Sequence, residues 1–95
     1  MESMMENQLY KRNINLIVKK IDQEYIAINA DNNNFFTVNE TGFLIFKFLF
    51  KKRYVAEIVE KLILRYKVNK NTLQEDIYEF LNNCIRNGLI RRYKS

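Results

Sequence analysis

The chain has 95 residues, a net charge of +5, 47% hydrophobic residues and 14% aromatic residues. That length allows a single domain with one core, and the hydrophobic content excludes a disordered chain. The charge alone does not establish nucleic-acid binding, because the basic residues gather in one loop and at the two ends instead of along one helix face.

The residue types and segments that the chain lacks limit the reactions it can catalyse and the cellular compartment we expect for it. One cysteine and no histidine exclude an internal disulfide, a Cys–His nucleophile and a zinc site built by this chain alone. There is no apolar run long enough to span a bilayer, no apolar signal-peptide core behind residues 1–6, and no Gly-rich phosphate loop. We therefore expect a cytoplasmic, non-catalytic protein without cofactor, metal or membrane contact.

Residues 1–12 are polar without a clear period, and we expect a flexible N-terminal segment ahead of a domain at residues 13–92. Alternating apolar residues from Ile14 to Val18 predict a first strand, and residues 25–28 predict a second. Four loop-forming residues at 31–34 (DNNN) separate it from a third short strand at residues 35–38. This pattern predicts a three-stranded antiparallel meander.

Three helices are expected to follow. Asn39 can cap the first, at residues 40–50, which is apolar nearly all round and must be buried on several sides, although a strand is the alternative for this short run. Residues 54–66 predict a second helix. The third begins after a break, with Asn71 or Thr72 as its cap, and ends at Gly88. The expected fold class is α+β and winged-helix-like: a three-stranded antiparallel β-sheet followed by three α-helices.

Three segments within residues 12–90 resemble the PqqD family, also called the RiPP precursor-recognition domain. VNETG at residues 38–42 is similar to the family's hydrophobic-Asn-x-Thr-Gly start of its first helix. AEIV at 56–59, with Leu62 and YKV at 66–68, resembles the second helix, and DI at 76–77, FL at 80–81 and GLI at 88–90 resemble the third. In two respects the chain departs from the family: Tyr54 stands where a polar cap is common, and residues 1–12 have no counterpart.

The resemblance implies a function. In this family the leader segment of a ribosomally synthesised precursor peptide adds as a strand beside the third strand, in a groove between that strand and the third helix. Residues 35–38 would form this edge, and they contain no Pro or Lys that would block pairing. The family also implies a partner modifying enzyme, of the radical SAM or the lasso-peptide protease and cyclase type, and leaves the product class open.

The candidate peptide contacts come from the third strand and the third helix. In a regular strand Phe35 and Phe36 point to opposite faces, so one belongs to the core and the other to the groove or to solvent. The apolar arc of the helix is wider than one packing face needs, so it either covers the sheet or also lines the groove. The predicted set is Phe35, Phe36, Thr37, Val38, Asp76, Tyr78, Leu81 and Ile85.

Other residues have two interpretations. Asp76 is also explained as a charge near a helix N-terminus, and Cys84 on the central stripe is expected to be a small buried hydrophobe. The basic loop (Lys47, Lys51, Lys52 and Arg53) and the basic tail at residues 91–94 are either solvated or attract an acidic peptide or enzyme surface.

Two alternative functions remain open at this point. A winged-helix DNA-binding protein would use the basic charge, but its third helix holds Glu75, Asp76 and Glu79 against a lone Arg86, and phosphate would be repelled. We therefore expect no nucleic-acid partner. The other alternative is a structural subunit that docks an enzyme by its basic loop without contacting peptide, and it is compatible with leader binding.

Overall fold

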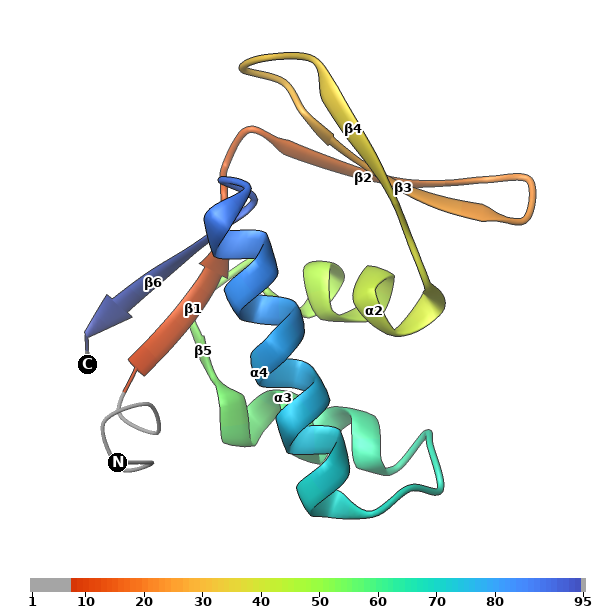
Figure 1. The fold of residues 1–95 in the computed structure, drawn as a ribbon, viewed down its shortest axis with the longest axis vertical. Coiled ribbons are helices and arrows are strands. Elements are labelled where there is room, and N and C mark those ends of the chain that lie inside the picture. Colours follow the sequence, from red (N-terminus) through yellow and green to blue (C-terminus); the bar gives the residue numbers. More distant parts are fainter. Residues whose placement is uncertain (1–7, 95) are drawn as a thin grey trace.

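The computed structural model describes residues 8–94 (Figure 1). Two small sheets and three helices make up the fold, and the longest helix, α4, has β1 and β6 on one side and α2 on the other. In chain order the elements are β1 (Gln8–Arg12), β2 (Leu16–Ile21), β3 (Glu24–Asn29), β4 (Asn34–Val38), α2 (Glu40–Phe48), β5 (Arg53–Tyr54), α3 (Val55–Ile63), α4 (Lys70–Arg86) and β6 (Ile90–Lys94). Among these described residues, no helix has the length and apolar character needed to cross a membrane.

The predicted meander is confirmed as the sheet β2-β3-β4. Its strands pair antiparallel, with Val18 opposite Ala27 and Ala27 opposite Phe36. In the two connecting turns Asp22 and Asn33 adopt φ values of 56° and 61°, a left-handed conformation that Asp and Asn tolerate better than most residues. The polar runs of the sequence therefore become the turns, and β4 becomes an outer strand of the sheet.

A second sheet, ordered β5-β1-β6, was not predicted. Residues 8–12, which we expected to be flexible, form its central strand, and Tyr10 is fully buried there. Leu9 lies opposite Tyr93 of β6 and opposite Tyr54 of β5. The folded unit thus includes residues 8–94, wider than the expected 13–92, while the expectation for residues 1–7 lies outside the described residues.

The helix ends follow from specific side chains. Asn39 caps α2 as predicted, because its Oδ1 accepts a hydrogen bond from the Gly42 N–H at 2.8 Å. α4 starts earlier than expected: its cap is Asn69, whose Oδ1 accepts from the N–H groups of Asn71 and Thr72, the two residues predicted as caps. Gly88 ends this helix with φ of 73°, a conformation that glycine adopts without strain.

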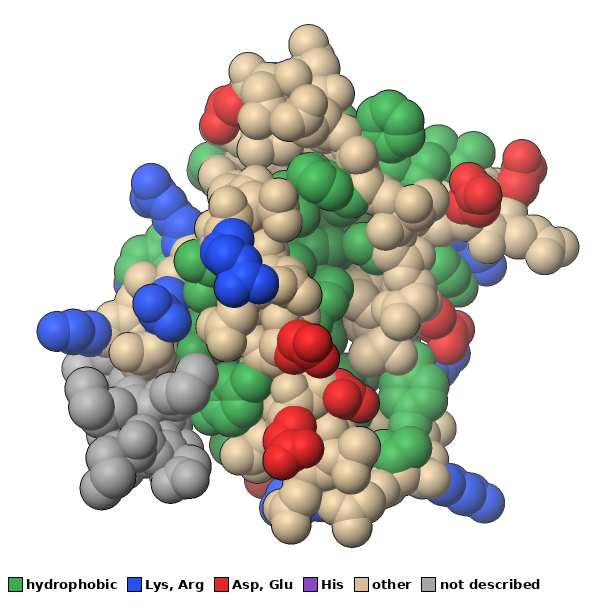
Figure 2. All heavy atoms as spheres, viewed as in Figure 1, with side chains coloured by type: hydrophobic (Ala, Val, Ile, Leu, Met, Phe, Trp, Pro, Cys, Tyr) green, Lys and Arg blue, Asp and Glu red, His purple; other side chains and the backbone are tan. Residues whose placement is uncertain are grey.

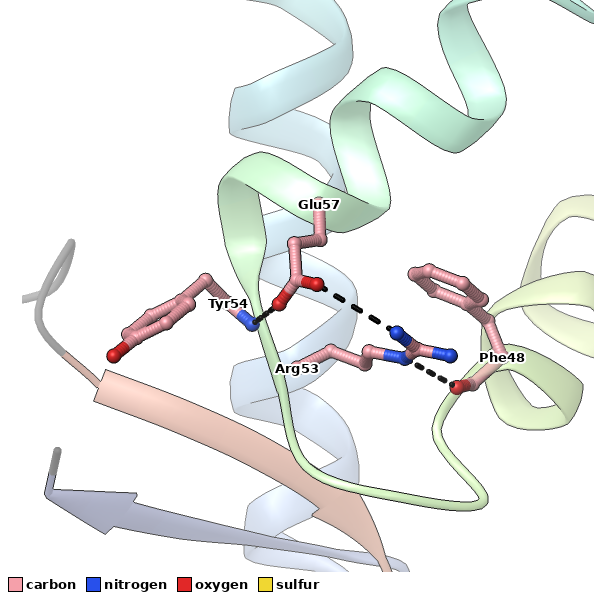
Figure 3. Close-up of polar contacts among 4 residues, drawn as sticks. All are labelled: Phe48, Arg53, Tyr54 and Glu57. Atoms are coloured by element: carbon pink, nitrogen blue, oxygen red, sulfur yellow. Dashed lines mark hydrogen bonds and ion pairs between the residues drawn. The ribbon is translucent and has the colours of Figure 1, made fainter.

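The start of α3 explains how the chain manages without a polar cap at Tyr54. The Glu57 carboxylate turns back and accepts from the Tyr54 N–H at 2.8 Å (Figure 3). Arg53 lies 3.6 Å from the other Glu57 oxygen and donates from Nε to the Phe48 carbonyl at 3.4 Å. Its guanidinium also lies 4.1 Å from the centre of the Phe48 ring. Arg53 therefore joins the end of α2 to the start of α3.

The core lies where the helices meet the two sheets. α2, predicted to be buried on several sides, places Ile45 and Phe46 in this core, whereas Phe50 just beyond it is 56% exposed. Burial of a side chain such as Ile45 or Phe46 contributes about 1.5–3 kcal/mol to stability. The largest fully buried side chains come from β1, from all three helices and from Leu49, which directly follows α2: Tyr10, Ile45, Phe46, Leu49, Ile58, Val59, Ile77 and Leu81.

Candidate functional site

β4 is an open edge. Within residues 8–94 it pairs with β3 alone, so one side of its backbone has no strand beside it. The sequence of β4, NFFTV, contains neither a charged residue nor a proline. Unpaired strand edges are usually blunted by charge, proline or a covering segment. An uncharged edge of this kind is therefore suited to accept a further strand.

The side chains of β4 alternate between two faces, as the sequence predicted. Phe36 lies opposite the fully buried Ala27 and packs against the core, together with Val38. Phe35 is 69% exposed and Thr37 is also exposed. Of the two phenylalanines, Phe36 is thus the core residue and Phe35 faces solvent. A strand added at this edge would meet both an apolar inner face and an aromatic outer face.

A hollow of about 320 Å³ lies between the start of α2, the segment that follows α3, and α4. No residue of β4 lines it, but Asn39, the residue directly after β4, does. We call it the α4 hollow. Asn39 and Gly42 line it from the start of α2, and Asp76, Glu79 and Phe80 line it from α4. Figure 2 shows hydrophobic side chains between α4 and the β2-β3-β4 sheet, with acidic side chains along α4 below them. The charged groups of this hollow are therefore acidic, which favours a basic group in whatever occupies it.

The structure divides the predicted contacts of the third helix between two flanks. Asp76 lines the α4 hollow, whereas Ile85 lines a different hollow together with residues of β6. At about 100° per residue these two positions lie on opposite sides of the helix, and Tyr78 is within about 20° of Ile85. Leu81 is fully buried and offers no surface to a peptide. Asp76 thus lies beside the start of α2, and Ile85 lies beside β6.

Phe80 and Gly42 are site residues that the sequence reasoning did not include. A Cβ added to Gly42 would lie 2.8 Å from Cε1 of Phe80, closer than side chains tolerate. The glycine therefore lets the Phe80 ring approach α2, where its centre lies 5.3 Å from that of Phe46. The signal was present, because Gly42 belongs to the VNETG segment and a glycine in a first helical turn points to close packing.

The cysteine and the acidic side chains are the candidates for a nucleophile and for a metal site. Cys84 is 5% exposed, as expected for a small buried hydrophobe, and burial raises the pKa of its thiol to about 12. A thiol with so high a pKa is a poor nucleophile at neutral pH. No group of three or more Cys, Asp or Glu side chains able to hold a metal ion occurs among residues 8–94.

The fold and this edge define a class of protein: a small winged-helix-like α+β domain whose three-stranded sheet has an open edge beside a helix. The family model for coenzyme PQQ synthesis protein D (PqqD) matches residues 24–90. This match covers more than half of the chain, so the chain belongs to the PqqD family. Among curated protein sequences, none matches this chain.

Two solved structures share the fold. One is TbiB1 in complex with the TbiA(beta) leader peptide, with a TM-score of 0.75 at 22% sequence identity, and the match covers 85% of this chain and 94% of that chain. The other is a lasso peptide synthetase B1 complexed with the leader peptide, with a TM-score of 0.74 at 18% identity, covering 86% of this chain and 96% of that one. At these identities the likeness establishes a common fold.

Proposed function

We propose that this protein binds the leader segment of a ribosomally synthesised precursor peptide as an extra strand along β4, and presents it to a modifying enzyme. The observation that carries the proposal is the open, uncharged edge of β4. The α4 hollow is lined from Asn39 onward, the residue directly after that strand. Membership of the PqqD family and the two leader-peptide complexes of the same fold support it.

Binding would divide into two parts. Main-chain hydrogen bonds along β4 supply affinity for any extended peptide, and the side chains on either face supply selectivity. Apolar leader residues would lie against Phe36 and Phe80, while a leader residue near Asp76 and Glu79 would be basic. Because both carboxylates are at the surface, a single such ion pair contributes only up to about 1 kcal/mol. Shape and main-chain pairing therefore outweigh charge at this site.

The protein would act as an adaptor and leave the chemistry to its partner. With no histidine in the sequence and its only cysteine buried as a thiol, the chain has no Cys–His nucleophile. The partner we propose is a modifying enzyme of the radical SAM type or of the lasso-peptide protease and cyclase type, in the cytoplasm. The acidic side chains on the exposed surface of α4 would repel phosphate, so DNA is not the ligand we propose.

The test is a titration of the ¹⁵N-labelled protein with the leader of the precursor peptide encoded beside it. We expect amide shifts along β4 and at Asp76 and Phe80, and cross-strand contacts between peptide and β4 protons. N-methylation of leader residues whose N–H groups face β4 should weaken binding at least about tenfold, because main-chain bonds are lost. N-methylation of the alternate residues, whose N–H groups face away, is the matched control and should change affinity little.

The variant Asp76→Asn adds a check on selectivity. It should weaken binding of a leader with a basic residue near this position by about threefold, and less at high salt. Amide shifts confined to other surfaces would rule out strand addition at β4. Equal losses of affinity from the two sets of N-methylated leader peptides would also rule it out.

A further inference from the structure

A second hollow, of about 550 Å³, lies between α2 and α3 and shares no lining residue with the α4 hollow. We call it the α2–α3 hollow. Its floor is apolar, with Leu44 and Phe48 half-buried and Leu62 only 3% exposed. At its rim Phe50 is 56% exposed and Leu64 is 89% exposed. Large exposed hydrophobic side chains that surround an apolar hollow are typical of an interaction surface.

The charged side chains of the α2–α3 hollow are all cationic. Lys47, Lys61 and Arg65 line it, and no acidic residue does. Among the described residues, Lys47 and Lys61 form no ion pair, and their ammonium groups lie 5.6 and 5.7 Å from the centres of aromatic rings of α2. These two cations are thus held beside the apolar floor by aromatic faces and remain available to an acidic partner.

The α2–α3 hollow is held in shape by contacts at its ends. Arg65 donates to Glu40 at 2.9 Å, and the Tyr66 hydroxyl donates to the other carboxylate oxygen at 3.1 Å. The hydrogen bond from Arg65, and then that from Tyr66, lower the pKa of the Glu40 carboxyl. At the other end Arg53 joins Phe48 to Glu57 (Figure 3). A hollow fixed at both ends loses less conformational entropy when a partner binds.

We infer that the α2–α3 hollow docks an acidic, amphipathic segment of the modifying enzyme. This inference rests on the proposed function, since the enzyme is the one that receives the leader. Apolar side chains of the segment would lie on Phe48 and Leu44 and contact Leu64, and its carboxylates would meet Lys47 and Lys61. Because the two hollows share no residue, the leader at β4 and the enzyme at α2–α3 can be bound at the same time.

The shape of this surface distinguishes a protein segment from a lipid bilayer. A flat anionic membrane would reach Phe50 and Leu64 at the rim, but it would leave the recessed floor at Phe48 and Leu62 without contact. A ridge of side chains, such as one face of an amphipathic helix, fills the floor and places charges at the rim together.

The experiment uses the ¹⁵N-labelled protein and a fluorescein-labelled synthetic helix with Glu on one face and Leu and Phe on the other. We expect binding by anisotropy, with amide shifts around Leu44, Phe48 and Leu64 and none along β4. The double variant Lys47→Glu, Lys61→Glu should weaken binding at least about tenfold, and Leu64→Ser should weaken it several-fold. The double variant Lys19→Glu, Lys94→Glu is the matched control, since both lysines are exposed and neither lines the hollow.

Each further outcome has a stated meaning. Equal binding of a helix with Lys in place of Glu, or no binding at all, overturns the docking surface and leaves leader binding at β4 untouched. Stronger binding to phosphatidylserine vesicles than to the acidic helix also overturns it, in favour of a membrane. Self-association that Leu64→Ser abolishes would make a second copy the occupant, against our inference. Binding of the acidic helix without any response of β4 to the leader would keep this surface and reject the proposed function.

Discussion

The two sheets differ most at their outer edges. β4 of the β2-β3-β4 sheet carries no charge, whereas β6, an outer strand of the β5-β1-β6 sheet, carries exposed Arg91, Arg92 and Lys94. Charged residues on an outer strand discourage further pairing. The central strands bury different side chains, because β1 carries the fully buried Tyr10 and β3 the fully buried Ala27, while Phe35 of the outer strand β4 is 69% exposed.

The difference indicates a division of work within one small fold. The β5-β1-β6 sheet closes the core and is protected at its edge, and the β2-β3-β4 sheet leaves one edge available. A mutation at a buried position of the β5-β1-β6 sheet should therefore change the free energy of unfolding, and a mutation at the exposed face of β4 should change peptide affinity. Variants of Tyr10, Phe35 and Arg91 test that separation, and Cys84 tests the packing of α4.

The largest effect is expected for Tyr10→Ala. Removing a fully buried aromatic side chain from the central strand should lower the free energy of unfolding by about 3–5 kcal/mol, measured by urea denaturation. The matched control is Phe35→Ala, which should change stability by no more than about 0.5 kcal/mol, because Phe35 is 69% exposed. Equal losses of stability from the two variants would contradict the division between the sheets.

Cys84 reports whether α4 stays packed. Since burial raises the pKa of its thiol from 9.0 to about 12, the thiolate fraction at pH 8 should be roughly 1,000-fold below that of the unfolded chain. Reaction with a thiol reagent should therefore be at least about 100-fold faster in denaturing urea. Free glutathione in the same urea controls for the reagent. A native rate equal to that of glutathione would show that the packing around α4 opens readily.

The same pKa shift of Cys84 determines how the stability of the protein changes at alkaline pH. A folded-state pKa above the unfolded one means that the folded chain keeps the proton longer. The contribution of Cys84 to stability is complete below about pH 9 and is lost as the pH rises toward 12. The free energy of unfolding, measured across that pH range, should therefore decrease less for Cys84→Ala than for the parent protein.

The smallest effect is expected when a charge is placed on the open edge. Phe35→Lys places on β4 a basic residue like those of β6 and should weaken leader binding by up to about fivefold, since one cross-strand contact contributes about 0.2–1 kcal/mol. Stability should stay nearly constant. Arg91→Thr on β6 is the converse variant, and calorimetry should find its leader affinity within a factor of about two of the parent. A larger loss of leader affinity for Arg91→Thr than for Phe35→Lys would place the peptide at the β5-β1-β6 sheet and contradict the proposal.

The parts of this fold that local patterns encode were predictable. The alternation predicted from Ile14 to Val18, the DNNN loop and the cap at Asn39 each act over a few residues. The loop and the cap are found in the structure, and the strand forms from Leu16 onward, while Ile14 lies in a turn and is 86% exposed. The second sheet was missed because it joins residues 8–12 to residues 90–94, and each strand alone is a short segment rich in polar or basic residues. Pairing over such a distance leaves no local period to detect.

The site was predictable only in part, for a related reason. Helical spacing identified the apolar arc of α4, but it does not say which side of the arc faces β4. The structure turns Asp76 and Phe80 toward the start of α2 and Ile85 toward β6. The cap of α4 shows the same limit, because Asn69, Asn71 and Thr72 are all residue types that cap helices, and only the backbone geometry selects Asn69.

The pairing of β1 with β6 has a practical consequence for attachment. Gln8 lies directly opposite Lys94, so the first and last described residues are neighbours in space, on a part of the molecule remote from β4 (Figure 1). Closely spaced ends suit circular permutation and insertion into a host protein. A tether joined at either position would raise the effective concentration of the β4 edge near an immobilised or fused enzyme, and the tether would not cover that edge.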